Sequence, residues 1–86
     1  MSNSSVFSIK NNSDDVLSVF IEPWGDEVKI KKAEEAIFFS KGGENSGNSF
    51  LYMKNGLVYM ALPGSMVEVH VNGVRLNTIS SCIEAS

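Results

Sequence analysis

Transition-metal binding or a cysteine–histidine pair in this chain would depend on one histidine, His70, and one cysteine, Cys82, because the sequence has no others. A blue-copper site needs two histidines and a cysteine, and a zinc site needs about four Cys, His or carboxylate ligands at suitable spacing. The sequence supplies neither set, and the methionines are more simply core filler. We therefore expect the protein to hold no transition metal and to need no cofactor.

Nucleophilic catalysis is also poorly supported. His70 stands beside Glu68 on the polar side of an alternating run, and the serines and threonines fall in turns without a nucleophile elbow. A pair between Cys82 and His70 stays open, although a surface histidine beside a glutamate is much the commoner outcome. Gly42-Gly43 precedes no helix that could bind phosphate. We predict that the protein is not an enzyme.

Calcium is a further alternative, because Glu22, Asp26 and Glu27 surround one turn and Asp14 and Asp15 could lie nearby. Hard cations take about six to eight oxygen ligands. The chain has no Asp-x-Asp-x-Asp-Gly loop, so an acidic, solvated turn is the favoured interpretation.

The stretch Glu-Pro-Trp-Gly-Asp-Glu, residues 22–27, contains the only tryptophan. Pro23 suits the second position of a tight turn and Gly25 the fourth, so the indole could simply fold over the edge of a small core, which is the favoured interpretation. The alternative is an exposed anchor, because tryptophan is enriched at binding hot spots, and nearby carboxylates would steer a basic partner. The candidate binding residues are Glu22, Trp24, Asp26 and Glu27.

Composition restricts the class of protein. A chain of 86 residues, 43% hydrophobic and 20% charged, is typical of one globular domain. No apolar run approaches the roughly 18 residues of a membrane span, and residues 1–5 do not resemble a signal peptide. A single cysteine fits a cytoplasmic location. The net charge of −3 argues against nucleic acid as a partner.

Short alternating runs broken by Gly, Asn, Pro and Ser predict an all-β domain. The first half contains four expected strands, at 6–9, 16–21, 27–32 and from 37 onward, after a turn at 32–36. Gly42 to Asn48 is the longest polar stretch and the expected mobile loop. We expect the ends, about 1–4 and 81–86, to be flexible.

The second half predicts hairpins. Asn55-Gly56 and Asn72-Gly73 are Asn-Gly pairs flanked by apolar alternation, which favours turns whose central residues have positive φ. Strands at 50–54, 57–62, 67–71 and 74–79 would then form a four-stranded meander. The fold class predicted is a small, single-domain antiparallel β-sandwich or barrel, spanning 1–86, of about seven to eight short strands.

Three stretches resemble a family of small uncharacterised bacterial all-β domains: Asn11 to Ser13 as an Asn-x-Ser turn, Glu22 to Gly25 as a Glu-Pro-Trp-Gly turn, and Val67 to Leu76 as a closing hairpin. Such a pattern has Pro-Gly after the third strand, where this chain has Lys32-Ala33. The strand order also looks similar to small transthyretin-like sandwiches, in architecture alone. Neither resemblance implies an activity or a catalytic residue.

The expected function is therefore a non-enzymatic protein-binding module, for example of the inhibitor or immunity type, and one candidate partner is a basic protein. One alternative is a carbohydrate- or small-ligand-binding module that uses Trp24, Tyr52 or Tyr59 as a stacking platform. Another is an assembly subunit, such as that of a homo-oligomer, in which exposed edge strands pair between chains.

Overall fold

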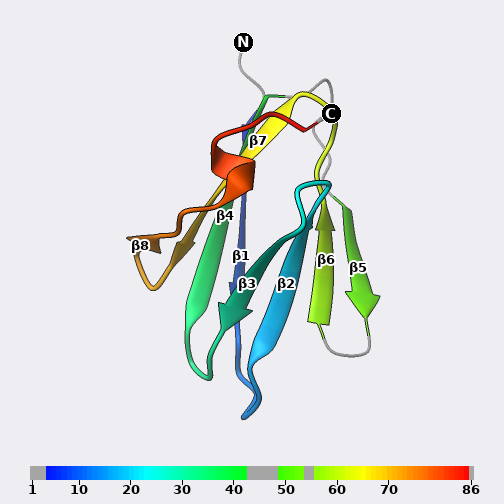
Figure 1. Cartoon of the computed structure of the whole chain (residues 1–86). Helices are drawn as coiled ribbons and strands as arrows, with labels where there is room; N and C mark the ends of the chain where they lie inside the picture. Colours follow the sequence, from blue (N-terminus) through cyan, green and yellow to red (C-terminus); the bar gives the residue numbers. More distant parts are fainter. Residues whose placement is uncertain (1–3, 43–48, 54–55, 86) are drawn as a thin grey trace.

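The computed structural model describes residues 4–42, 49–53 and 56–85 (Figure 1). The described chain folds into strands and one short 3₁₀ helix, η1. Their bounds are β1 (Ser4–Lys10), β2 (Leu17–Glu22), β3 (Asp26–Ile30), β4 (Glu35–Gly42), β5 (Ser49–Met53), β6 (Gly56–Met60), β7 (Ser65–Val71), β8 (Val74–Arg75) and η1 (Ile79–Ser81). The all-β class is confirmed.

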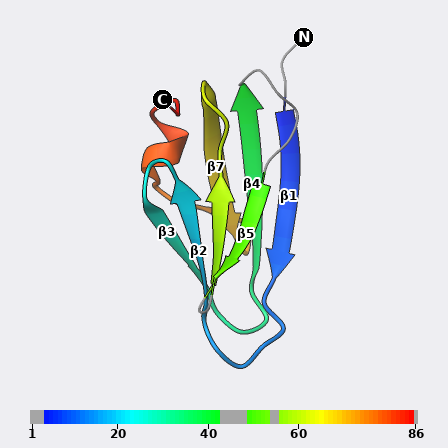
Figure 2. The same ribbon diagram turned by 90° about the vertical axis from the view of Figure 1, so that its right-hand side faces the viewer.

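Two four-stranded sheets face each other (Figure 2), one in the order β1-β4-β7-β8 and the other β3-β2-β6-β5. The fold is thus a sandwich rather than a barrel. Neighbouring strands are antiparallel except β2 and β6, which are parallel. The predicted meander is wrong, because β5 and β6 belong to one sheet while β7 and β8 belong to the other.

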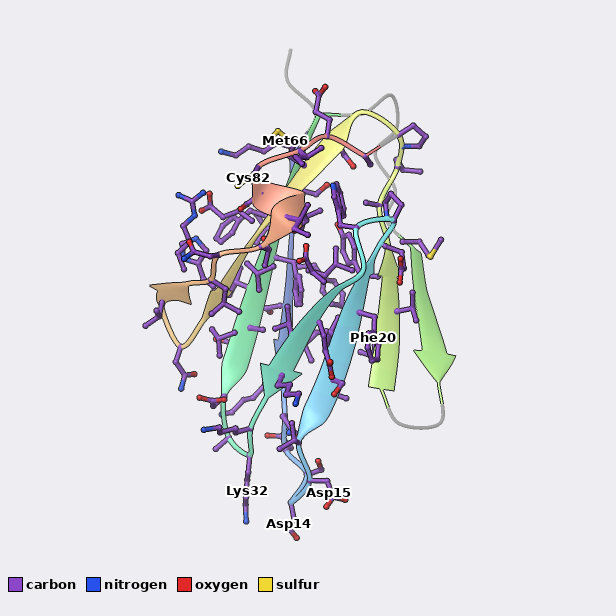
Figure 3. All side chains as sticks on the ribbon, in the orientation of Figure 1. Asp14, Asp15, Phe20, Lys32, Met66 and Cys82 are labelled. Atoms are coloured by element: carbon purple, nitrogen blue, oxygen red, sulfur yellow. The ribbon has the colours of Figure 1, made fainter. Side chains whose placement is uncertain are left out.

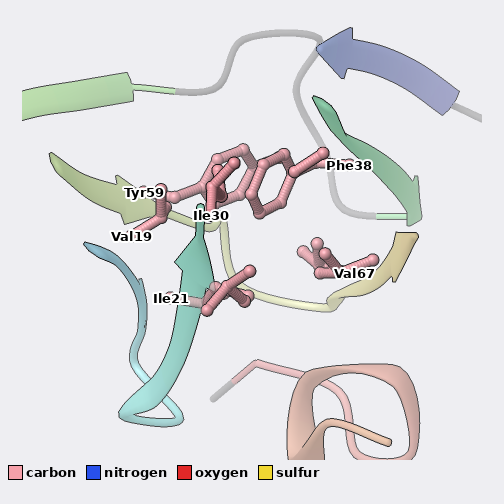
Figure 4. Packing of buried hydrophobic residues seen from close by; sticks show 9 residues of the cluster. Val19, Ile21, Ile30, Phe38, Tyr59 and Val67 are labelled. Atoms are coloured by element: carbon pink, nitrogen blue, oxygen red, sulfur yellow. The ribbon is translucent and has the colours of Figure 1, made fainter. Parts of the chain in front are cut away.

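Alternating side chains from both sheets fill the core between them. On β7 the inward residues Val67 and Val69 are buried, as their spacing predicts. Phe38 of one sheet stacks on Tyr59 of the other, with ring centroids 5.7 Å apart (Figure 4). Burial raises the pKa of the Tyr59 phenol, and a hydrogen bond with the Ser40 side chain opposes that shift. Tyr59 therefore belongs to the core and offers no stacking platform to a ligand.

The side chain of Asn11 stabilises one end of the sandwich through hydrogen bonds. Its side chain is buried and donates to the carbonyl oxygens of Asp15 at 2.7 Å and Ile30 at 2.8 Å. Its Oδ1 accepts from the backbone N–H of Ser13 at 3.0 Å and from the Ser13 hydroxyl at 2.7 Å. The Asn-x-Ser turn therefore has a structural reason, since each polar atom of the asparagine side chain has a partner.

The turn predicted at 32–36 is shorter than expected, because β4 already begins at Glu35, and Ala33 lies within it with φ of 67°. This left-handed conformation favours glycine. Alanine therefore occupies a backbone conformation that glycine would adopt at lower cost.

The two Asn-Gly pairs have different roles. Asn72 and Gly73 have φ of 50° and 80°, which confirms the predicted hairpin turn between β7 and β8. Gly56 instead pairs with Met53 as the first residue of β6, and its φ is not positive. A Cβ atom there would collide with the Ser18 carbonyl oxygen, so close strand approach, not turn geometry, requires this glycine. Asn55 lies outside the described residues, as does the stretch 43–48 of the expected mobile loop.

The C-terminal segment follows the edge of β7 where the sequence predicts a strand to residue 79 and then a frayed end. Strand β8 stops at Arg75, and beyond it η1 forms at Ile79–Ser81. Ser80 and Ala85 are buried, and the Ala85 N–H donates to the Ser65 carbonyl at 2.8 Å. Burial and backbone hydrogen bonds thus hold this C-terminal segment, residues 76–85, which we call the tail, against the rest of the fold. No helix in the described ranges is long and apolar enough to cross a membrane.

Candidate functional site

The turn between β2 and β3 presents Trp24. Its closing hydrogen bond runs from the Gly25 N–H to the Ile21 carbonyl at 2.9 Å, and Gly25 has φ of 80°. The loop therefore begins one residue earlier than the turn expected from Pro23 and Gly25 alone. The Glu22–Pro23 peptide bond is cis. Gly25 supplies the positive φ that lets β3 start directly afterwards.

Trp24 is half-buried and packs against the hydrophobic core. Its indole Nε1 donates a 2.7 Å hydrogen bond to the carbonyl oxygen of Ile83 in the tail. Trp24 is thus neither fully buried nor fully exposed: the ring folds back over the edge of the core, and part of it stays accessible.

Asp26 has a structural role in the same region. Its Oδ1 accepts from the Ile79 N–H at 3.2 Å and its Oδ2 accepts from the Ser80 N–H at 2.9 Å. These are the free N–H groups at the start of η1, which a carboxylate satisfies well. Asp26 thus fixes the first residues of the tail beside the Trp24 turn.

The other two predicted carboxylates face away from the core. Glu27 precedes buried Val28 on β3, is exposed, and its Oε2 accepts from the Ser18 hydroxyl at 3.1 Å. Glu22 follows buried Ile21 on β2 and is half-buried. Because successive strand residues alternate between faces, Asp26 and Glu27 point to opposite sides. The three carboxylates therefore do not form the single rim that the sequence suggested.

Two isoleucines of the tail complete the accessible surface. The side chains of Ile79 and Ile83 are 51% and 59% exposed, and the Ile83 N–H donates to the Ile79 carbonyl at 3.0 Å. Because the indole is hydrogen-bonded to the Ile83 backbone, we group these two residues with Trp24 and call the three the Trp24 surface (Trp24, Ile79 and Ile83). Sequence reasoning missed both isoleucines because it placed Ile79 at the end of a strand and Ile83 in a frayed end. The available signal was their four-residue spacing, which places side chains together on a helical turn.

His70 is the second polar feature of the fold. Its Nε2 lies 2.6 Å from Glu68 Oε2, and Arg75 Nε lies 3.6 Å from Glu68 Oε1. The hydrogen bond with His70, more than the Arg75 charge, lowers the pKa of the Glu68 carboxyl. The Phe39 ring packs edge-on against the imidazole, with the two ring centroids 5.1 Å apart. Cys82 Sγ lies 3.8 Å from the Ser81 hydroxyl. None of the described contacts of Cys82 joins it to His70.

The structure separates the carboxylates that the calcium alternative would bring together. Asp14 and Asp15 lie at one end of the sandwich, where Lys32 pairs with Asp14 at 2.7 Å, and Cys82 next to η1 lies at the other end (Figure 3). Asp26 is bound to η1, so the two acidic groups are separated by the length of β2. Among the residues that the structure describes, no three His, Cys, Asp or Glu side chains gather as metal ligands would.

Comparisons with family models, with curated proteins and with solved structures each find no match for this chain. The resemblance to small bacterial β-domains therefore stays an expectation based on its three stretches of sequence.

Proposed function

We propose that this chain is a non-enzymatic protein-binding module that contacts its partner through the Trp24 surface. The observation that carries the proposal is that half-buried Trp24 is hydrogen-bonded to the backbone of a segment whose isoleucines, Ile79 and Ile83, are each more than half exposed. Tryptophan is enriched at binding hot spots, because one ring removes a large apolar area from water while its N–H keeps a hydrogen bond.

The surroundings favour a basic partner segment. Residues 22–27 and 76–86 contain Glu22, Asp26, Glu27 and Glu84 and no lysine, arginine or histidine. Asp26 is taken by the N–H groups of η1, but Glu22, Glu27 and Glu84 remain as local negative charge. We therefore infer an apolar partner segment with flanking Lys or Arg residues, because complementary charge accelerates encounter and fixes orientation.

The site is largely formed before binding. Asp26 and Ile83 each fix the tail against the turn through hydrogen bonds of 3.2 Å or less. Less conformational entropy is then lost when a partner binds. A cytoplasmic location remains part of the proposal, supported by the single, exposed cysteine.

Selection from a library of random peptides displayed on phage tests this function without knowledge of the natural partner. We expect enriched peptides to combine apolar residues with Lys or Arg and to compete for binding at the Trp24 surface. The matched decoy is Val74→Ser, which removes a side chain that is 64% exposed on β8, outside this surface.

Selected peptides should bind the parent chain and Val74→Ser equally and should lose binding to Ile79→Ser/Ile83→Ser. Enrichment of acidic or purely polar peptides, or equal binding to all three proteins, would remove the Trp24 surface from consideration.

A further inference from the structure

The edges of the two sheets differ in how their backbone is protected. The tail covers the outer edge of β7: the carbonyls of Val69, Val67 and Ser65 accept in turn from the Leu76 N–H at 2.9 Å, the Ser80 hydroxyl at 2.8 Å and the Ala85 N–H at 2.8 Å. Alternate carbonyls of an edge strand point outward, so these three contacts cap this side of the sheet. Edge strand β3 is protected differently, by the exposed charges of Glu27 and Lys29.

Strand β1 is the opposite edge of the sheet that contains β7. It is seven residues long, Ser4 to Lys10, and its one charged residue is Lys10 at the end. Edge strands without central charge, proline or a bulge are templates for pairing with another strand. Edge strand β5 is also uncharged but has five residues, so β1 offers the longer template.

Two apolar side chains on β1 are accessible. Phe7 points toward the core, where its ring lies 6.5 Å from that of Phe38, yet it is 38% exposed. Val6 points to the outer face and is 65% exposed. Its cross-strand neighbour on that face is Phe39 of β4.

We propose that β1 pairs antiparallel with β1 of a second copy of this chain, about a two-fold axis at Phe7. Only an axis at the fourth residue pairs the seven-residue strand along its full length. Phe7 then faces Phe7 of the second copy, and an aromatic cross-strand pair covers the exposed part of both rings.

The charges are compatible with this symmetry. Lys10 faces Ser4 of the second copy, so the two lysines of β1 lie at opposite ends of the shared ladder and no like charges lie directly opposite each other. On the outer face Val6 lies opposite Ser8 of the second copy, a small uncharged side chain whose own partner on β4 is Ile37. The two sheets would join into one that crosses both subunits, an isologous contact.

Sedimentation equilibrium over a concentration series tests the pairing. The parent chain should change from its 9.4 kDa monomer toward twice that mass as concentration rises. In Val6→Lys/Ser8→Lys, each lysine at position 6 faces a lysine at position 8, so the dimer dissociation constant should rise by about tenfold or more. Position 6 is 65% exposed and Ser8 is exposed, so thermal melts at low concentration should match the parent.

The double variant Val6→Lys/Ser8→Glu tests the register of the proposed β1–β1 pairing. Pairing about Phe7 places Lys opposite Glu twice, so this variant should dimerise at least as well as the parent. A parent that stays monomeric throughout the series overturns the proposal. Equal dimerisation of both double variants also overturns it, as does loss of the dimer in Val6→Lys/Ser8→Glu. Ile79→Ser/Ile83→Ser should dimerise normally, which separates this contact from the Trp24 surface.

Discussion

The indole nitrogen of Trp24 lies 2.7 Å from the carbonyl oxygen of Ile83, a residue 59 positions further along the chain. This hydrogen bond joins the β2–β3 turn to the tail, and the Asp26 carboxylate makes a second connection at the start of η1. The two segments therefore form one structural unit, although they lie near opposite ends of the sequence.

Replacing Trp24 by phenylalanine should loosen the tail. Trp24→Phe keeps an aromatic ring but has no N–H for the Ile83 carbonyl, and we expect a loss of about 1 kcal/mol in the free energy of unfolding. Hydrogen exchange should accelerate at the Ala85 and Gly64 amides, which hold the end of the tail. Ile83→Ala is the matched control, because it keeps the backbone carbonyl. Unchanged exchange in Trp24→Phe would show that this hydrogen bond does not hold the tail.

Asn11 should be among the most sensitive polar positions. Asn11→Ala leaves the buried carbonyl of Ile30 without its 2.8 Å donor, and we expect a loss of about 2–3 kcal/mol. Neighbouring Asn12 is exposed, so Asn12→Ala should change stability by less than about 0.5 kcal/mol. Urea denaturation of the two variants gives the comparison, and similar midpoints would contradict a structural role for the Asn-x-Ser turn.

A glycine at position 33 should stabilise the protein. Ala33 has φ of 67°, which is unfavourable for a residue with a Cβ atom, so Ala33→Gly should raise the free energy of unfolding by about 0.5–1 kcal/mol. Lys32→Gly, in the same turn but without positive φ, should lower it. A thermal melt of Ala33→Gly below that of the parent would show that the strain is absent in solution.

The two glycines of the Asn-Gly pairs should respond differently to alanine. Gly56→Ala forces a Cβ atom onto the Ser18 carbonyl and should cost about 2–3 kcal/mol. A Cβ atom at Gly73 meets no atom within 4 Å, so Gly73→Ala should cost only about 1 kcal/mol from its positive φ. Gly73→Asn should be milder still, since asparagine tolerates this region. Chemical denaturation that ranks Gly73→Ala as the more damaging change would reverse this assignment.

Local patterns predicted the parts of the fold that depend on neighbouring residues. Alternation identified the buried face of β7, and Asn72-Gly73 identified its turn, because pleat and turn geometry are encoded within a few residues. The pairing of strands that are distant in the sequence could not be predicted from such local patterns. The parallel contact of β2 with β6 and the crossing from β6 to β7 depend on which sheet a strand joins, and strand periodicity is the same in either sheet.

In the candidate site, too, local features could be predicted from the sequence and long-range contacts could not. Sequence chemistry singled out Trp24 and Asp26 as candidate binding residues, with an exposed anchor as the alternative to a structural role for Trp24. It could not anticipate that Asp26 would accept from η1, or that the indole would donate to the Ile83 carbonyl, because those contacts join segments more than 50 residues apart.

Binding of a selected basic, apolar peptide to the parent chain and to Ile79→Ser/Ile83→Ser tests the central claim most directly. Trp24 is the only tryptophan, so its emission reports contact at the Trp24 surface. We predict a blue shift on binding to the parent and an affinity at least about 30-fold weaker for the double variant, the loss expected when hot-spot side chains are removed. Equal affinity for the two proteins, with no change in Trp24 emission, would contradict the assignment of this surface as the protein-binding site.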